Sequence, residues 1–227
     1  MSGSEIIDYA VLIPLLPFLA FPVILFLGKI FNGTPTWIKN VKEGGIIALT
    51  VMGASLILTL LVIKEHLNKV GSANVFTWFE SSWWDPSAID PISTKVFGFG
   101  IYIDHLTVML LFVAAFLCFL INIFSIGYMN TDSINDNRNH RFYAEFVLFC
   151  SGMLGMVFAD SFLWLFIFWE LMGLCSYLLI GFYYERPSAA YAAKKAFLTT
   201  RVGDVFLVIG LVMLWNLFDG TLDYDVL

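Results

Sequence analysis

The sequence predicts an all-α integral membrane protein with about six transmembrane helices, and three observations support this class. Hydrophobic residues make up 59% of the 227 residues, whereas charged residues make up only 13%, about half the roughly 25% of a soluble domain. The mean hydropathy is +0.84. Uncharged stretches near or above the ~20 residues that a helix needs to cross the hydrocarbon recur along the chain. No ten-residue alternating pattern indicates a barrel, so helices are expected to satisfy the backbone in lipid.

The first three expected spans contain no charged residue. They cover residues 9–28, 44–63 and 106–130. Three prolines in the first span predict a kinked helix that still crosses the membrane. The segment 64–105, rich in glycine, proline and tryptophan, is expected to form an ordered external loop.

The last three spans touch or contain charges, and are expected at 142–159, 161–184 and about 196–218. The uncharged part of the fourth span, residues 146–159, is bracketed by Glu145 and Asp160, so the helix has to begin earlier, near Phe142. The fifth contains Glu170 well inside an apolar run. The sixth reaches the required length only if Arg201 and Asp204 are admitted into its first turns.

Basic residues gather in alternate loops, which predicts the orientation. The first, third and fifth loops hold Lys29, Lys39, Lys42, Arg138, Arg141, Arg186, Lys194 and Lys195. The positive-inside rule then places the N-terminus outside and these loops in the cytoplasm, in a multi-pass protein of the cell (cytoplasmic) membrane. The net charge of -6 and the absence of a Lys/Arg-rich run argue against nucleic acid as a partner.

Several chemistries are not expected on this chain. Cys118, Cys150 and Cys175 stand singly in apolar runs, which is typical of small buried side chains. The three histidines lie at or beyond the span ends, where they do not suit haem held inside the membrane. The glycines form no phosphate loop or dinucleotide fingerprint. We therefore expect no catalytic residues, bound cofactor or metal here.

Glu170 is the most informative residue because it stands alone in the fifth span. A charge near the bilayer centre costs on the order of 2.5–3.5 kcal/mol on insertion scales, so such residues are functional by default. Burial favours the neutral acid unless a cation is nearby, and a carboxylate of this kind can hold and release a proton. On a helix it shares a face with Gly173 and Tyr177, which offer close backbone approach and a hydroxyl partner.

A second group of charges lies at the start of the sixth span. Arg201 and Asp204 are three residues apart on one helical face, where they can pair. A structural ion pair and a role in proton conduction are equally open for them. Lys195 lies two turns earlier and suits either anchoring at the interface or the same pathway. Glu145, about one turn inside the fourth span, is a candidate entry-side acid.

At these residues the sequence resembles a known family. The stretch "FWELMGLCSYLLIGFYY" (168–184), followed after a short loop by "KAFLTTRVGD" (195–204), is similar to the largest antiporter-like membrane subunit of respiratory complex I. The resemblance extends back through "IDHLTVMLL" (103–111), "FSIGYM" (124–129) and "RFYAEF" (141–146). Related multi-subunit cation/proton antiporters share the first motif and generally lack the second as written here.

The resemblance implies roles for particular residues. Glu170 corresponds to the family's glutamate of the fifth helix, which modulates a lysine and takes part in proton translocation. Arg201 and Asp204 match the sixth-helix pair, and Lys195 matches a lysine often found there. The family commonly has a histidine before the stretch "FSIGYM", where this chain has Asn122.

The resemblance also implies an incomplete unit. The family's partner lysine, broken seventh helix and second half would lie beyond Leu227. We therefore expect the N-terminal portion of an inverted-repeat fold, either a fragment or one product of a split gene. Residues 1–105 would hold helices 1–2 and the external loop, and residues 106–227 would hold helices 3–6, the start of the proton-translocating module.

The function implied is that of a subunit in a proton-translocating NADH (or F420H2- or ferredoxin-linked) quinone oxidoreductase. Its NADH or F420H2, flavin, iron–sulfur clusters and quinone would be bound by other subunits, and the partners would be further membrane subunits and lipid. The alternative is a subunit of a multi-subunit sodium/proton antiporter without a redox partner. A structural fragment that conducts nothing is a third interpretation.

Overall fold

The computed structural model describes residues 9–28, 44–68, 74–83, 95–131, 138–218 and 222–224. Its elements follow the chain in this order: η1 (Tyr9–Val11), α2 (Leu12–Leu27), α3 (Gly45–Asn68), β1 (Asn74–Trp83), β2 (Lys95–Ile103), α4 (His105–Thr131), α5 (Asn139–Phe158), α6 (Phe162–Ile180) and α7 (Pro187–Leu217).

Six helical segments among the described residues are long and apolar enough to cross a membrane, which confirms the expected number of spans. The first joins η1 to α2, and α3 to α7 supply the others. The chain is therefore a multi-pass membrane protein. The loop at 29–43, with the lysines that contributed to the predicted orientation, lies outside the described residues.

The boundaries of the last two spans differ from the prediction. α6 ends at Ile180, since Gly181 caps it and its amide N–H donates to the Tyr177 carbonyl at 3.0 Å. α7 then begins at Pro187, well before residue 196, because proline is well suited to the first turn of a helix. Its 31 residues would extend about 46 Å at 1.5 Å per residue, more than the ~30 Å hydrocarbon core. Arg201 therefore lies mid-helix, not in the first turns.

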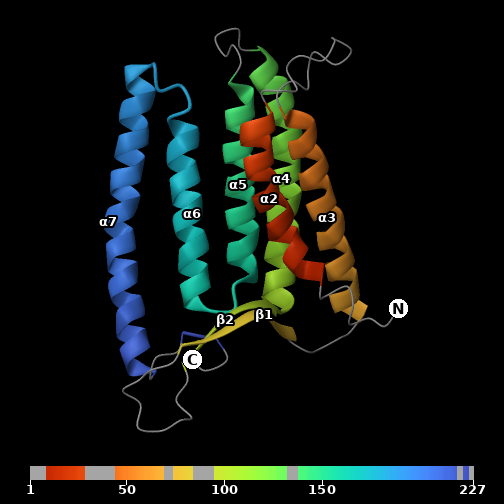
Figure 1. Ribbon diagram of the computed structural model, residues 1–227, viewed down its shortest axis with the longest axis vertical. Coiled ribbons are helices and arrows are strands. Elements are labelled where there is room, and N and C mark those ends of the chain that lie inside the picture. Colours follow the sequence, from red (N-terminus) through yellow and green to blue (C-terminus); the bar gives the residue numbers. More distant parts are fainter. Residues whose placement is uncertain are drawn as a thin grey trace.

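The segment that was expected to form an external loop contains a β-hairpin that the sequence analysis did not predict. β1 and β2 pair antiparallel from Asn74↔Ile103 to Trp83↔Lys95, with a register shift between Thr77 and Phe79. Both strands are rich in β-branched and aromatic residues, which favour a pleated sheet. The hairpin lies across one end of the helices (Figure 1), which we call the hairpin end. The opposite end, where α5 begins and α6 turns into α7, carries Arg138, Arg141, Arg186 and Lys194 and is the basic end.

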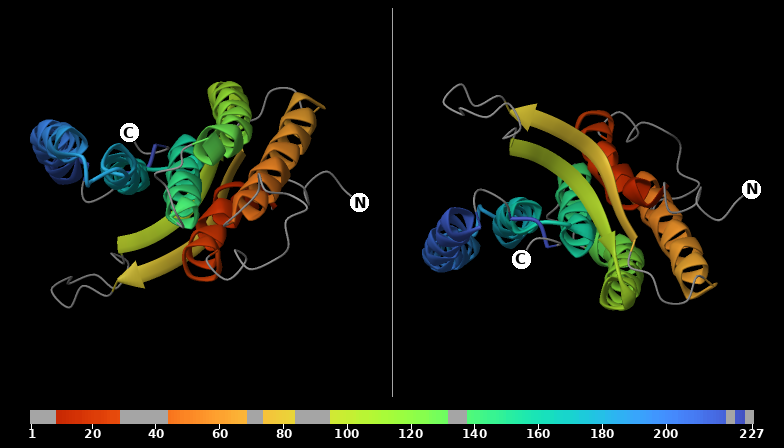
Figure 2. Two further views of the ribbon diagram at one scale, coloured as in Figure 1. Left: turned by 90° about the horizontal axis from the view of Figure 1, so that it is seen from above. Right: turned by 90° about the horizontal axis from the view of Figure 1, so that it is seen from below.

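α5 occupies the centre of the helical arrangement. It packs against α2, α3, α4 and α6, and most of its side chains are buried. Seen along the helices, α5, α6 and α7 form a row that leads away from the cluster of α2, α3 and α4 (Figure 2). α7 packs chiefly on α6, so most of its surface is exposed within this chain.

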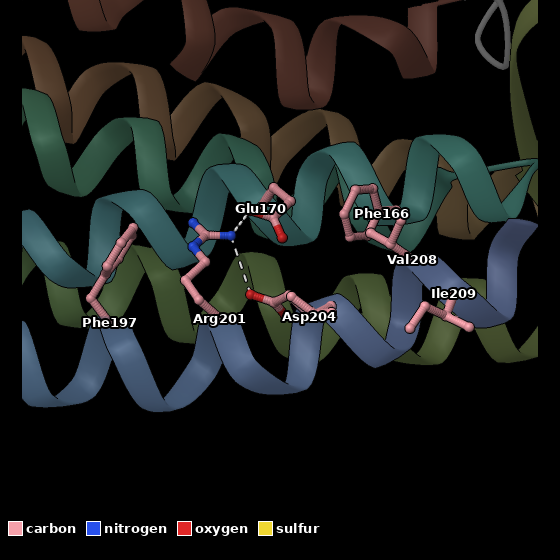
Figure 3. Close-up of a pocket in the computed structure, with 8 residues that line it drawn as sticks. Phe166, Glu170, Phe197, Arg201, Asp204, Val208 and Ile209 are labelled. Carbon is pink, nitrogen blue, oxygen red and sulfur yellow. Dashed lines mark hydrogen bonds and ion pairs between the residues drawn. The ribbon is translucent and has the colours of Figure 1, made fainter.

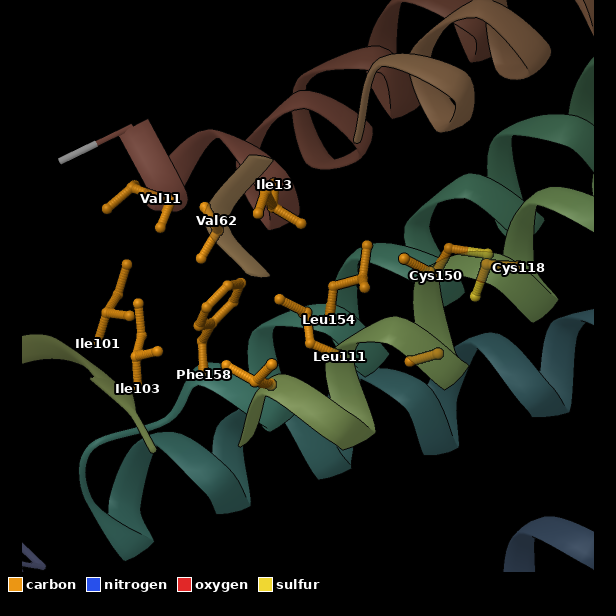
Figure 4. Packing of buried hydrophobic residues seen from close by; sticks show 14 of the residues in the cluster. Val11, Ile13, Val62, Ile101, Ile103, Leu111, Cys118, Cys150, Leu154 and Phe158 are labelled. Carbon is orange, nitrogen blue, oxygen red and sulfur yellow. The ribbon is translucent and has the colours of Figure 1, made fainter. Parts of the chain in front are cut away.

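The main core fills the space between α2, α3, α4 and α5 towards the hairpin end. It includes Ile101 from β2 and the fully buried Phe158 from α5 (Figure 4). Cys118 and Cys150 lie in the same cluster, and Cys175 is also buried, which confirms the cysteines as small core side chains. The core draws on both sides of residue 105, and the division of the chain at that point stays a prediction.

Two serines on neighbouring helices donate hydrogen bonds to backbone carbonyls of α2, and a proline leaves one of these carbonyls without its helical donor. The helix continues through Pro17 and Pro22, but Pro17 has no N–H to donate to the Ile13 carbonyl one turn earlier. Ser55 Oγ of α3 donates to that oxygen at 3.1 Å, and Ser151 Oγ of α5 donates to the Pro14 carbonyl at 2.8 Å. Because lipid offers no replacement donor, these bonds fix α2 against both neighbours.

Asp160 joins three chain segments at the hairpin end. It lies between α5 and α6, and its carbonyl accepts the Tyr224 N–H at 3.1 Å. Gly100 of β2 packs so closely that a Cβ there would lie 1.9 Å from Asp160 Oδ2. Burial, reinforced by the charge of Asp223, raises the pKa of Asp160 to about 6, although the Gly100 N–H partly opposes this. The neutral acid therefore suits this junction better than the carboxylate does.

We expect Ser151→Ala to lower the free energy of unfolding by about 1 kcal/mol, since it removes an interhelical hydrogen bond to the Pro14 carbonyl. Denaturant unfolding in detergent measures the change. Thr50→Val is the matched control, because the Thr50 hydroxyl bonds to Ile47 of its own helix on an exposed face. Equal stability of the two variants would contradict the prediction.

The Asp160 junction predicts a pH dependence of stability. The pKa rises from an ordinary 3.8 to about 6 on folding, so the contribution of Asp160 is fully present below 3.8 and lost as the pH rises through 6. The melting temperature of Asp160→Asn should therefore vary less than that of the wild type between these values. Glu185→Gln, which alters an exposed acid, should keep the wild-type pH profile.

Candidate functional site

Three charged side chains meet at the interface between α6 and α7, near the middle of both helices. Glu170 comes from α6, and Arg201 and Asp204 come from α7. Arg201 Nη1 forms an ion pair with Glu170 Oε2 and lies 3.2 Å from Asp204 Oδ2 (Figure 3). The predicted pairing of Arg201 with Asp204 is confirmed, and the same guanidinium also pairs with Glu170. We call these three residues the charged triad.

Neighbouring side chains hold the triad in place. Trp169 Nε1 donates to Asp204 Oδ1 at 3.0 Å, so both oxygens of this carboxylate have partners. Gly173 gives the Arg201 guanidinium room, because a Cβ at this glycine would lie 3.4 Å from Nη2. The guanidinium carbon also lies 4.7 Å from the centre of the Phe197 ring, within cation–π range.

The triad lines an open pocket of about 580 Å³, which we call the triad pocket. Its other walls are apolar and include Phe166 and Val208 (Figure 3). The side chains of Glu170 and Arg201 remain 29% and 26% exposed within this chain. With two carboxylates and one guanidinium, the fully ionised triad carries one uncompensated negative charge. A further cation beside the triad would compensate this charge.

Glu145 lies in a separate group at the basic end. Its carboxylate is nearly buried, and Oε1 accepts a hydrogen bond from Arg141 Nε at 2.6 Å. Oε2 is buried without a hydrogen-bond partner among the described residues. Arg141 and Lys194 line a cleft of about 420 Å³ between α5, α6 and α7, which we call the basic-end cleft. Glu145 thus lies beside an opening at this end, where the sequence predicted an entry-side acid.

The structure does not bring Lys195 into either group. Lys195 is exposed on α7 and is not among the residues that line the triad pocket or the basic-end cleft. Tyr177, expected to offer Glu170 a hydroxyl, has its ring against that of Phe197, with centroids 5.1 Å apart. Glu170 has Arg201 as its partner instead, and the role of Lys195 stays a prediction.

The other polar residues of interest lie at helix ends or in the buried interior of the described helices. Asp104 Oδ1 accepts the Thr107 N–H at 2.6 Å and so caps α4. His66 and His105, at the hairpin-end termini of α3 and α4, hydrogen-bond to each other at 3.1 Å. Asn122, in place of the family's histidine, is fully buried and its amide has no partner within the described part of the chain. No group of three or more metal-ligating side chains occurs among the described residues.

Sequence reasoning missed two members of the site. Trp169 directly precedes Glu170 in the quoted motif, and its indole N–H was given no role. Phe197 stands four residues before Arg201, the spacing at which helical side chains stack, and this spacing could have identified it. Neither residue is ionisable, so a search for charges at membrane depth does not select it.

Two family profiles match the chain. Residues 159–227 match the transmembrane region of the NADH:quinone oxidoreductase/Mrp antiporter family, and residues 90–143 match the N-terminus of chain 5 of NADH-ubiquinone oxidoreductase (complex I). The first match includes the whole charged triad. The chain is therefore similar to membrane subunits of the antiporter-like class.

Three curated relatives are similar to nearly the whole of this chain. The chain is 38% identical over 217 residues to F(420)H(2) dehydrogenase subunit L of Methanosarcina mazei, covering 94% of this chain and 28% of that protein. It is 36% identical to NADH-quinone oxidoreductase subunit L of Mycobacterium tuberculosis, with 99% and 32% covered. Chloroplastic NAD(P)H-quinone oxidoreductase subunit 5 of Mesostigma viride is 34% identical, with the same coverage.

The predicted resemblance is thus confirmed: the chain is similar to the N-terminal part of the largest antiporter-like subunit of complex I-type enzymes. It spans about 28–32% of the length of these relatives. A solved structure of the membrane-bound sulfane sulfur reductase, an archaeal respiratory membrane complex, shares the fold with a TM-score of 0.68 at 21% identity, covering 94% of this chain and 38% of that one.

The triad predicts an asymmetric response to charge removal. Arg201→Gln leaves Glu170 and Asp204 facing each other without a cation, whereas Asp204→Asn leaves the Glu170–Arg201 pair intact. We expect Arg201→Gln to cost on the order of 2 kcal/mol of unfolding free energy, below the 3–5 kcal/mol of a fully buried pair because the side chains are partly exposed. Asp204→Asn should cost less. Unfolding in detergent measures both, and the reverse order would contradict this account.

Proposed function

We propose that this chain contributes part of a transmembrane proton pathway in a proton-translocating NADH (or F420H2- or ferredoxin-linked) quinone oxidoreductase of complex I type. The observation that supports it most is the charged triad at mid-helix, which lines the triad pocket and carries an excess negative charge. The relatives reported above are named as subunits of a dehydrogenase or of quinone oxidoreductases.

The triad can store a proton because its charges depend on one another. Arg201 stabilises the ionised form of Glu170 through their ion pair, but it also pairs with Asp204. Any shift of the guanidinium towards Asp204 exposes Glu170 to an apolar surrounding, in which the neutral acid is favoured. Glu170 then takes up a proton, and the return of Arg201 favours its release. Proton binding and the position of one cation are therefore linked.

A further cation would complete the site. The family resemblance implies a partner lysine, and the excess negative charge of the triad suits such a group in the open pocket. Two charges several ångströms apart at low effective dielectric interact strongly enough to switch a protonation state. Other membrane subunits and lipid would cover the exposed faces of α6 and α7.

The redox chemistry would take place elsewhere in the complex. NADH or F420H2, flavin, iron–sulfur clusters and quinone would be bound by other subunits, and this chain would carry no redox site of its own. Electron transfer would reach the triad as an electrostatic signal through neighbouring membrane subunits.

The orientation follows from the basic end. Arg138, Arg141, Arg186 and Lys194 would face the cytoplasm and the hairpin would face outside, in the cell membrane, with the N-terminus outside. The basic-end cleft would then be the cytoplasmic entry, with Glu145 beside it. Lys195 would lie on the same side, near the entry.

We expect Glu170→Gln to abolish proton translocation by the assembled complex, since the amide keeps the shape but cannot exchange a proton. Acidification of sealed membrane vesicles driven by the complex's electron donor measures the effect. Blue-native electrophoresis of the same membranes shows whether the complex assembles.

Glu185→Gln is the matched control, because Glu185 is an exposed acid in the α6–α7 turn, paired with Arg138. It should pump like the wild type. Normal pumping by an assembled Glu170→Gln variant would overturn the proposal. A sodium-dependent pH gradient without any electron donor would instead favour the antiporter alternative.

A further inference from the structure

Two cavities lie along the same interface between α6 and α7, and an aromatic pair stands between them. Phe197 lines the triad pocket, whereas Tyr177 lines the basic-end cleft. The two rings contact each other, with centroids 5.1 Å apart and planes inclined by 55°. A proton or water that passes along this interface from the cleft to Glu170 has to pass this pair.

The sequence of α6 places the pair at a constriction. Gly173, Tyr177 and Gly181 follow one another at four-residue intervals, so they share one helical face. Gly181 lies directly against α7, since a Cβ there would be 3.2 Å from Ala193 Cβ, whereas Gly173 lies beside the Arg201 guanidinium at an ordinary contact distance. The two helices are thus close on one side of Tyr177 and bridged by the Arg201 side chain on the other, and the Tyr177 ring lies between these two contacts.

The pair is also connected to the charged triad. Phe197 lies one turn before Arg201 on α7, and the Arg201 guanidinium carbon lies 4.7 Å from the ring centre. The same guanidinium pairs with Glu170. Arg201 therefore touches both the carboxylate that would bind the proton and one of the two rings on the way to it.

We propose that Tyr177 and Phe197 form a gate between the basic-end cleft and the triad pocket, and that Arg201 couples this gate to the charge of Glu170. The inference rests on the proposed proton pathway and adds its regulation. Apolar constrictions close by excluding water, because a water molecule there lacks the two to four polar partners that it needs. The closed pair thus interrupts a hydrogen-bonded chain without any charge of its own.

Movement of Arg201 supplies the opening step. When the guanidinium shifts towards Asp204, it leaves its position over Phe197, so the ring loses a cation–π contact and becomes freer to turn. The same shift leaves Glu170 without its cation and able to take up the proton that enters from the basic-end cleft. When Arg201 returns, it favours release of the proton and restores its contact with Phe197, which closes the way back to the cleft.

The test uses the assembled complex in sealed vesicles without electron donor. Tyr177→Ala and Phe197→Ala should each raise passive proton leak on the order of tenfold, since loss of 1.4 kcal/mol from a barrier is tenfold in rate. With donor present, the protons moved per electron should fall while electron transfer continues. A purely structural role would not change the ratio of protons to electrons in an assembled complex.

Two control variants separate the effect of losing the Tyr177 ring from the effects of losing its hydroxyl or of changing another tyrosine. Tyr177→Phe keeps the ring and removes the hydroxyl, so it should leak and pump like the wild type. Tyr191→Ala removes a tyrosine of α7 that is 70% exposed and lines neither cavity, and it should also be unchanged. Leak in Tyr177→Phe equal to that of Tyr177→Ala would replace the gate with a hydroxyl relay and overturn the proposal.

Different experimental results would overturn the gate and the proposed function. Wild-type leak and coupling in assembled Tyr177→Ala and Phe197→Ala, together with loss of pumping in Glu170→Gln, would overturn the gate alone. Retained pumping in Glu170→Gln would overturn the proposed function first. Should an alanine variant not assemble, Tyr177→Ser removes the ring and offers water a polar partner in a side chain that a membrane helix accepts; a wild-type leak in it would count against the gate.

Discussion

The site depends on the constraint that charges inside a membrane have to compensate one another. Glu170, Arg201 and Asp204 would each be costly alone at this depth, and the structure brings them together across two antiparallel helices. Gly173 on α6 and the indole of Trp169 both serve this arrangement, one by making room and one by donating a hydrogen bond. The compensation is incomplete by one charge, because two carboxylates share one guanidinium.

The rest of the fold supports that interface from one side. α5 is packed on several faces and presents α6 to α7, while the serine bonds to α2 and the hairpin-end junction at Asp160 hold the cluster together. Few side chains of α6 and α7 are buried, so the densely packed part of the described chain ends at α5. A flat row of helices with its charges near the exposed edge suits a surface against which further helices pack.

Much of this could be predicted from the order of residues. The number of spans, the buried cysteines, the position of Glu170 inside a span and the Arg201–Asp204 pair follow from hydropathy and helical spacing, because both are local properties. The hairpin was missed since its strands lie in a segment read only for its turn residues. The start of α7 was missed because charged residues near its beginning were taken as a boundary, although a helix can continue beyond the hydrocarbon.

The sequence by itself determined that this is a membrane protein with isolated charges at depth, since composition alone sets the cost of those charges. Tertiary structure decided which charge meets which: Glu170 pairs with Arg201 and not with a hydroxyl, and Lys195 lies apart. It also decided that Tyr177 and Phe197 stand between two cavities. Such contacts depend on the rotation of one helix against another, which is fixed by packing of residues far apart in the chain.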